Sequence, residues 1–227
     1  MIASILRTLA QIFSWIFHPL LILTYMLVFL LVVNPYPFGV PEWKDRLPLI
    51  AEVFANTFLI PAFALIMFRL VGFAKSLEMK STQERIGPYI ASGVLYLWLF
   101  VNLQRHPNVP SPYKSFVLGA TISLFLAFFI NNFSKISAHA VGMGGLLGMF
   151  LIAIETYYGG SFTLAPAGWF EWRLDMLDSL LLVILAAGIV GSSRLLLRAH
   201  EPMEVYGGYL VGFGGQLVAL QFVYMFA

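Results

Sequence analysis

Residues 191–209, GSSRLLLRAHEPMEVYGGY, place charged and imidazole side chains between two apolar runs. His200 and Glu204 are four residues apart. A carboxylate at this spacing can bond one nitrogen of the ring, fix its tautomer and leave the other nitrogen free to attack. Arg194 carries a guanidinium of the kind that binds phosphate oxygens in pairs. The pattern indicates a histidine nucleophile, oriented by Glu204, beside an anion-binding arginine.

Two other polar segments carry groups that suit the same chemistry. Ser137 fits the N-cap of a helix, whose free N–H groups would face an anion. His139, at the start of that helix, is placed to protonate a leaving oxygen as general acid. The segment KSTQERIGP adds Lys80 and Arg85. Together with Arg194, Arg198, His200 and Glu204, these residues predict a pocket for a polyanion, with phosphate a better fit than carboxylate.

The elements that must position these residues are membrane-spanning helices. Of 227 residues, 60% are hydrophobic and 11% are charged, against roughly 25% charged residues in a soluble domain. A crossing needs about 20 apolar residues, and no alternating pattern suits a β-barrel. We expect an all-α, polytopic transmembrane bundle of about six to seven spans, forming one integral membrane domain over residues 1–227. The spans fall near 12–33, 49–72, 88–104, 114–133, 139–158, 177–196 and 204–226.

This topology brings the polar segments together. The second, fourth and sixth loops are separated by pairs of spans, so they emerge on one face of the membrane and can build one site. Gly144 and Gly148 in the fifth span, and Gly208 and Gly212 in the last, have the spacing of close contacts between membrane helices. We expect these glycines to bring the fifth and last spans together. His18 and His106 have no partner in the sequence, and we predict a structural role for both.

The three motifs resemble those of the type 2 phosphatidic acid phosphatase superfamily. SRLLLRAHEPME resembles the third motif, which is Ser-Arg, five residues, His, three residues and Asp, with Glu204 here in place of Asp. SAH at 137–139 resembles the Ser-Gly-His core of the second motif, with Ile136 in place of its Pro. The first motif, Lys, six residues and Arg-Pro, differs more: Lys80 lies five residues before Arg85, and Pro88 follows three residues after it. Lys75 and Lys135 are alternatives to Lys80.

The resemblance covers residues 75–210, which form a phosphatase-like core. It implies a metal-independent hydrolase, without cofactors, that acts on a lipid phosphate or diphosphate such as phosphatidic acid, phosphatidylglycerol phosphate or a polyprenyl diphosphate. It further implies a phosphohistidine at His200, oriented by Glu204, with His139 protonating the leaving alcohol. The phosphate ligands implied are Arg85, Ser137, Arg194 and Lys80. Two alternatives stay open: a non-catalytic relative that binds anionic lipid, and a small transporter.

Charge and cysteine content restrict the partners. The net charge of +2 argues against nucleic acid, and the absence of cysteine excludes disulfides, thiol nucleophiles and thiolate metal sites. The partners expected are the bilayer and a lipid phosphate substrate. We expect a multi-pass protein of the cell membrane. Basic residues do not decide its orientation once those assigned to phosphate are removed, and the family's commoner arrangement places the site on the outer face.

Overall fold

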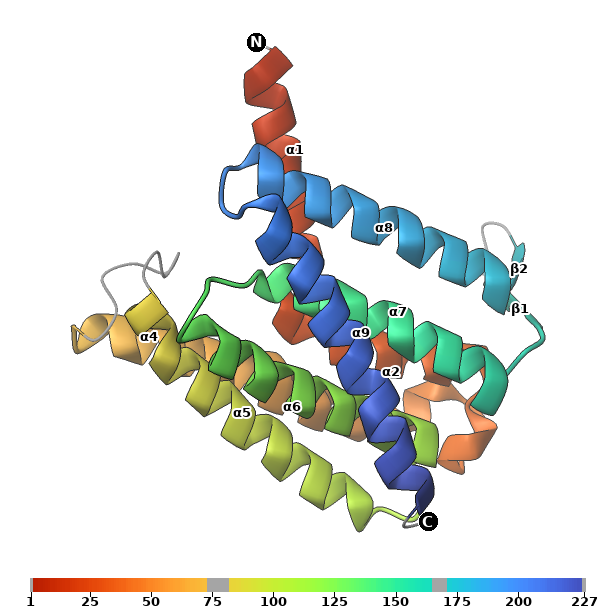
Figure 1. Cartoon of the computed structure of the whole chain (residues 1–227). Helices are drawn as coiled ribbons and strands as arrows, with labels where there is room; N and C mark the ends of the chain where they lie inside the picture. The colour runs from red at the N-terminus through yellow and green to blue at the C-terminus, as the bar shows by residue number, and fades with distance from the viewer. Residues whose placement is uncertain (1, 73–81, 165–170, 226–227) are drawn as a thin grey trace.

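The computed structural model of the chain describes residues 2–72, 82–164 and 171–225, and it confirms the all-α membrane architecture (Figure 1). Six apolar helical stretches in these residues are long enough to cross a membrane. They are 4–33, 36–70, 83–104, 111–131, 138–156 and 176–196. The helices are α1 (Ile2–Ile16), α2 (Ile22–Val33), α3 (Leu47–Phe54), α4 (Ile60–Leu70), α5 (Thr82–Gln104), α6 (Ser111–Asn131), α7 (Ala138–Thr156), α8 (Met176–Leu196) and α9 (Pro202–Met225).

The first expected span, 12–33, falls within the apolar stretch 4–33, but it is not one continuous helix. α1 ends at Ile16, and a short 3-10 turn, Pro19–Leu21, leads into α2. His18 has extended backbone angles, φ −64° and ψ 131°, because the ring of a following proline disfavours helical geometry in the residue before it. The chain therefore turns a corner at His18, and α1 and α2 run in different directions.

The second expected span is also two helices, joined by the wide π-helical turn Ala55–Leu59. Pro61 follows this turn and has no N–H to donate to the carbonyl four residues earlier. Thr57 in the turn is fully buried, and its hydroxyl lies 3.2 Å from the hydroxyl of Thr24 on α2. This contact attaches the irregular part of the span to the core.

The interior of the bundle is filled by large apolar side chains from α2, α5, α6 and α7. Leu27, Leu99, Phe116 and Met143 each have no exposed surface. They belong to one continuous cluster of buried residues that extends from α2 to α8. This core fixes the positions of the bundle helices relative to one another. The arrangement of the polar residues at the ends of these helices depends on it.

A small hairpin that the sequence did not predict closes the end of the bundle away from the expected site. β1 (Ser161–Leu164) pairs antiparallel with β2 (Trp172–Asp175), so that Phe162 lies opposite Leu174. α8 begins directly after it with a capping box, in which Asp175 accepts from the Asp178 N–H at 2.7 Å and Asp178 accepts from the Asp175 N–H at 3.1 Å. These two carboxylates satisfy the free donors of the helix start.

The predicted glycine contact between α7 and α9 is confirmed. A Cβ atom on Gly208 would lie 2.7 Å from the Ala140 side chain, and one on Gly148 would lie 2.9 Å from the Gln216 side chain. On Gly144 and Gly212 it would collide with the backbone of the other helix. α9 is not among the six candidate membrane stretches, and its glycines let its backbone approach α7 closely.

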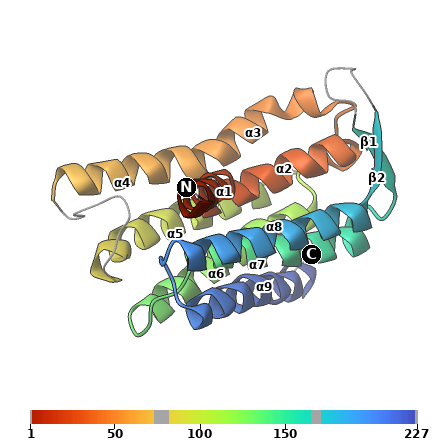
Figure 2. The same cartoon turned by 90° about the horizontal axis from the view of Figure 1, so that it is seen from above.

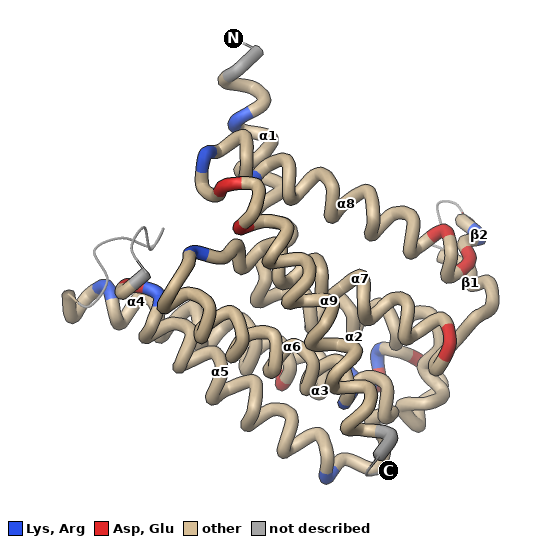
Figure 3. The backbone as a smooth tube through the Cα atoms, in the orientation of Figure 1, with Lys and Arg blue, Asp and Glu red and all other residues tan. Residues whose placement is uncertain are grey.

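The loops expected to share a face do lie at one end of the bundle. The end of α4, the start of α5, the turn between α6 and α7 and the turn between α8 and α9 all lie on the left in Figure 1. Most charged residues lie near the two ends of the helices, and the middles are largely uncharged (Figure 3). The polar segments from distant parts of the chain can therefore form one site.

Candidate functional site

The centre of the site is the pair formed by His200 and Glu204 at the start of α9. His200 Nδ1 lies 2.6 Å from Glu204 Oε2, and the side chains are 4% and 17% exposed. Since a carboxylate only accepts, Nδ1 carries the proton and Nε2 keeps its lone pair. The backbone N–H of Glu201 also donates to Glu204 Oε2, at 3.3 Å. The sequence prediction of an oriented histidine is matched in its geometry.

Burial lowers the pKa of His200 to about 4, and the charge of Arg194 acts in the same direction. Lys135 adds a smaller effect of the same sign, while the hydrogen bond to Glu204 opposes all three. The imidazole is therefore neutral near pH 7. A neutral ring with Nδ1–H held by a carboxylate is the state that a nucleophilic histidine requires.

Arg194 lies near the C-terminal end of α8 and is half-buried among the site residues. Its Nη1 donates to the Ser14 hydroxyl of α1 at 3.4 Å. Its Nε is buried and has no hydrogen-bond partner within the residues that the structure describes. A buried donor without a partner is costly, so an anion at this position would supply the missing acceptor. Arg194 interacts electrostatically with Arg85, His139 and His200.

His139 is held by α1 from the other side. Its Nε2 lies 3.0 Å from the backbone carbonyl of Ser14. Because a carbonyl only accepts, Nε2 is the protonated nitrogen, and Nδ1 is the atom left to exchange a proton with a substrate. Ser14 thus contacts two of the expected site residues, through its carbonyl and through its hydroxyl. Sequence reasoning missed Ser14, since it is 125 positions from His139 and belongs to no motif.

The segment before α7 contributes Ser137 as a cap, as expected. Its hydroxyl accepts from the Ala140 N–H at 3.4 Å, and the residue has no exposed surface. Arg85, on α5, reaches this segment and donates from Nη1 to the carbonyl of Ile136 at 3.4 Å. Arg85 is therefore brought to the site, whereas the Ser137 hydroxyl faces its own helix.

Lys135, one of the two alternatives to Lys80, lines the same pocket as His200. Its Nζ donates to the carbonyl of Ala199 at 2.8 Å. A pocket of about 480 Å³ opens here, lined by Lys135, Leu195, Arg198, Ala199, His200, Glu201, Pro202 and Glu204. Lys80 and Lys75 lie outside the described residues. Lys135 is thus the lysine that the structure brings to the pocket.

Arg198 forms the turn that carries the chain from α8 to α9. It adopts the left-handed conformation, with φ 52°, and the Ala199 N–H after it donates to the carbonyl of Arg194 at 3.1 Å. A left-handed residue after a helix commonly ends it in this way. The turn sets His200 against the end of α8 that bears Arg194.

His18, for which a structural role is expected, caps the 3-10 turn before α2 and lies beside the same cluster. Its ring packs edge-on against His139, with centroids 5.6 Å apart, and it interacts electrostatically with Arg194. Its Nδ1 accepts from the Leu20 N–H at 3.4 Å, which leaves the proton on Nε2. The signal in the sequence was the His-Pro pair, which breaks a helix inside an apolar run. His106 lies exposed in the loop after α5.

No family model, curated protein or solved structure matches this chain.

The arrangement of side chains therefore has to be interpreted on its own chemistry. Lys135 and Arg194 act electrostatically on the neutral His200, Arg85 acts in the same way on Arg194, and Glu204 is engaged by the His200 ring. Such a group attracts a multiply charged anion and presents a nitrogen lone pair to it. Within the described residues, no group of three or more His, Asp or Glu side chains could hold a metal ion.

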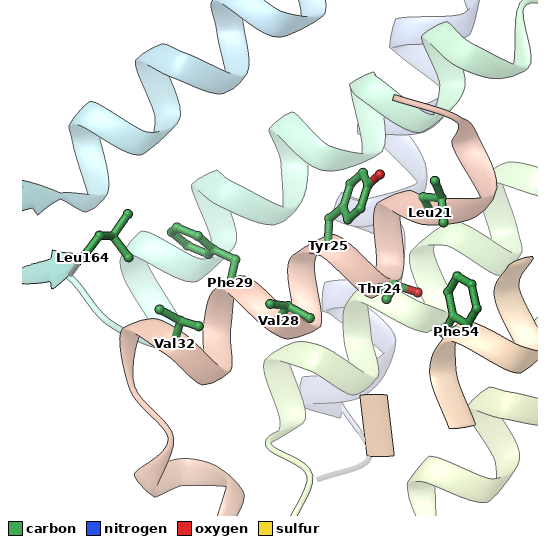
Figure 4. Close-up of a pocket in the computed structure, with 8 residues that line it drawn as sticks. All are labelled: Leu21, Thr24, Tyr25, Val28, Phe29, Val32, Phe54 and Leu164. Carbon is green, nitrogen blue, oxygen red and sulfur yellow. The ribbon is translucent and has the colours of Figure 1, made fainter. Parts of the chain in front are cut away.

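A second, apolar pocket runs along α2 from the corner at His18. It has a volume of about 570 Å³ and is lined by Leu21, Thr24, Tyr25, Val28, Phe29, Val32, Phe54 and Leu164. Figure 4 shows these side chains in a row along α2, with Leu164 of β1 at one end. Its near end begins three residues after His18. The pocket has the dimensions and lining of a site for a hydrocarbon chain.

Proposed function

We propose that this protein is an integral membrane phosphatase for a lipid phosphate or diphosphate. The observation that carries the proposal is the neutral His200, held by Glu204 at 2.6 Å and placed beside Lys135 and the half-buried Arg194. The resemblance of the three motifs to the type 2 phosphatidic acid phosphatase superfamily supports the same reaction. The substrates considered are phosphatidic acid, phosphatidylglycerol phosphate and a polyprenyl diphosphate.

The reaction has two steps. His200 Nε2 attacks phosphorus while the bond to the leaving oxygen breaks, and protonated His139 delivers a proton from Nδ1 to that oxygen. Water then attacks the phosphohistidine, His139 Nδ1 takes the proton from the water, and phosphate leaves with the nitrogen restored. Arg85 and Arg194, with Lys135, stabilise the charge on the phosphoryl oxygens.

The apolar pocket along α2 supports a lipid as the substrate. A lipid lying with its chain among Tyr25, Phe29 and Val32 would have its head near the corner at His18, which contacts His139. We further propose the cell membrane as the location, with the site on the outer face.

A second candidate is a non-catalytic protein that binds anionic lipid. The observation that favours it is the depth of His200, whose side chain is only 4% exposed, since nucleophilic attack needs access to Nε2. Both candidates bind phosphate at the same residues, and turnover distinguishes them.

The test is release of phosphate from a panel of lipid phosphates by the purified protein, with chelator present. We expect turnover by the wild type, its loss in His200→Ala and His139→Ala, and full retention in the matched control His106→Ala. Rapid quenching in alkali, with labelled substrate, should trap a phosphohistidine that is stable to base and labile to acid. Phosphate binding without release by folded protein would establish the second candidate instead.

A further inference from the structure

α1 runs across the other helices instead of alongside them. In Figure 1 it stands upright while α2 and α5 to α8 extend from left to right, and in Figure 2 it is viewed nearly along its own axis. It lies at the end of the bundle that holds the turns before α7 and before α9. Because the bundle helices cross the membrane, a helix that runs across them at their ends lies along the membrane surface.

One side of α1 is an exposed apolar stripe. Ile5, Leu9, Ile12 and Ile16 recur at intervals of three and four residues, which places them on one face of a helix, and each is between 45% and 52% exposed. No described residue covers this stripe. Four large aliphatic side chains in a row are too apolar to face water by themselves.

The remaining sides of α1 have different partners. Ala10 and Ser14 are buried, and the helix packs against α8. Ser4, Thr8 and Gln11 lie on a flank of the helix, between the apolar stripe and the buried side, and are exposed. Trp15, 79% exposed, lies on the same flank, where an indole suits the boundary between lipid and water. The helix thus has one side for protein, one for lipid and one for water.

α1 also carries a part of the site. The carbonyl of Ser14 accepts from His139, its hydroxyl accepts from Arg194, and the carbonyl of Ile16 accepts from the Tyr25 hydroxyl at 2.9 Å. These contacts attach only the C-terminal end of α1 to the bundle. The N-terminal part of α1 must be held by other contacts, and the apolar stripe indicates that these contacts are with an apolar environment.

We propose that α1 lies in the plane of the bilayer interface, with Ile5, Leu9, Ile12 and Ile16 inserted among lipid chains. Arg7 sits on the first turns, where it can pair with anionic lipid headgroups. The lipid surface, together with α8, holds Ser14 against His139 and Arg194. The inference does not depend on the proposed function, since it concerns the placement of the helix and not turnover.

Site-directed spin labelling tests the placement, because the chain has no cysteine and a single one can be introduced anywhere. Nitroxides at Ile5, Leu9, Ile12 and Ile16, and controls at Thr8 and Gln11, are measured in liposomes with oxygen and with a water-soluble nickel complex as relaxing agents. We expect one common shallow depth at the four stripe positions and strong relaxation by nickel at the two controls. A depth that changes steadily from Ile5 to Ile16 would overturn the proposal in favour of a crossing helix. Strong nickel relaxation at the stripe would also overturn it.

Amide hydrogen exchange in liposomes provides a second measurement with matched variants. Leu9→Asp and Gln11→Asp introduce the same charge two residues apart, on the apolar and the polar side. We expect exchange of the α1 amides to quicken at least tenfold in Leu9→Asp and to stay within twofold of wild type in Gln11→Asp. Equal effects of the two variants would contradict insertion of the stripe.

Discussion

The backbone N–H of Ser137 donates to the backbone carbonyl of Glu204 at 3.2 Å. The residue that caps α7 is thereby joined, through main-chain atoms, to the residue that orients His200. The two loops most important for the candidate chemistry therefore hold each other in register directly. This bond joins the start of α7, which carries His139, to the start of α9, which directly follows His200.

Replacement of Glu204 tests the orientation of His200. In Glu204→Ala the ring loses the acceptor of its Nδ1 proton, so both the tautomer and the ring position become free. We expect kcat to fall by on the order of 10²-fold or more, with a much smaller change in KM. Glu204→Asp, which introduces the residue of the family motif, is the matched variant and should keep more activity than Glu204→Ala. Equal loss in the two variants would contradict orientation of the ring by a carboxylate at this position.

The pKa of His200, lowered to about 4, predicts the acid side of the pH profile. The ring stays neutral in the folded protein between pH 6.5 and about 4, so kcat/KM should hold across this interval instead of falling below pH 6.5. The unfolded chain binds a proton at this histidine in the same interval and the folded chain does not. The contribution of His200 to the free energy of unfolding is therefore complete above pH 6.5 and is lost progressively as the pH falls toward 4. Denaturation of the wild type and of His200→Gln at several pH values measures this contribution. The same dependence of the free energy of unfolding on pH in both proteins would contradict the lowered pKa.

The glycine contact between α7 and α9 predicts a large difference between two alanine substitutions on one helix. A Cβ on Gly212 would lie 2.6 Å from the amide nitrogen of Gly145, whereas one on Gly214 has no neighbour within 4 Å. We expect Gly212→Ala to lower the free energy of unfolding by about 1–3 kcal/mol and Gly214→Ala to leave it nearly unchanged. Thermal unfolding in detergent checks both. Similar stability of the two proteins would argue against close packing of the helices.

The proposed outer-face site predicts which turns react with a membrane-impermeant maleimide. Glu201→Cys places a thiol in the exposed turn between α8 and α9, and Tyr36→Cys places one in the loop between α2 and α3, at the opposite end. In intact cells we expect labelling of Cys at 201 and none at 36, and labelling of both after the membrane is permeabilised. The reverse pattern would put the site in the cytoplasm.

Hydropathy and motif spacing were sufficient to predict the bundle and most of the residues at its polar end. Apolar runs of about 20 residues have few alternatives to helical crossings, and the i, i+4 spacing of His200 and Glu204 brings the two side chains together on any helix. The corner at His18 could have been read from the His-Pro pair, since the residue before a proline avoids helical angles. The apolar composition of the run from Ile12 to Val33 concealed it.

The remaining features depend on tertiary contacts that no local pattern encodes. Ser14 acts through its backbone carbonyl, which every residue type has, so its sequence identity carries no signal. His18 and His139 are adjacent only because α1 turns across the end of α7. Lys135 reached the pocket because the turn after α8 presents the carbonyl of Ala199 to it, a geometry fixed by the left-handed Arg198.

The seam of glycines between α7 and α9 also has a consequence for biosynthesis. Among the described helices α9 is synthesised last, and it brings His200 and Glu204 with it. Until α9 docks, the backbone of α7 around Gly144 is open to lipid, and His200 is not yet placed near His139. Under the proposed function, the nascent chain therefore lacks a complete site for lipid phosphate until α9 has docked.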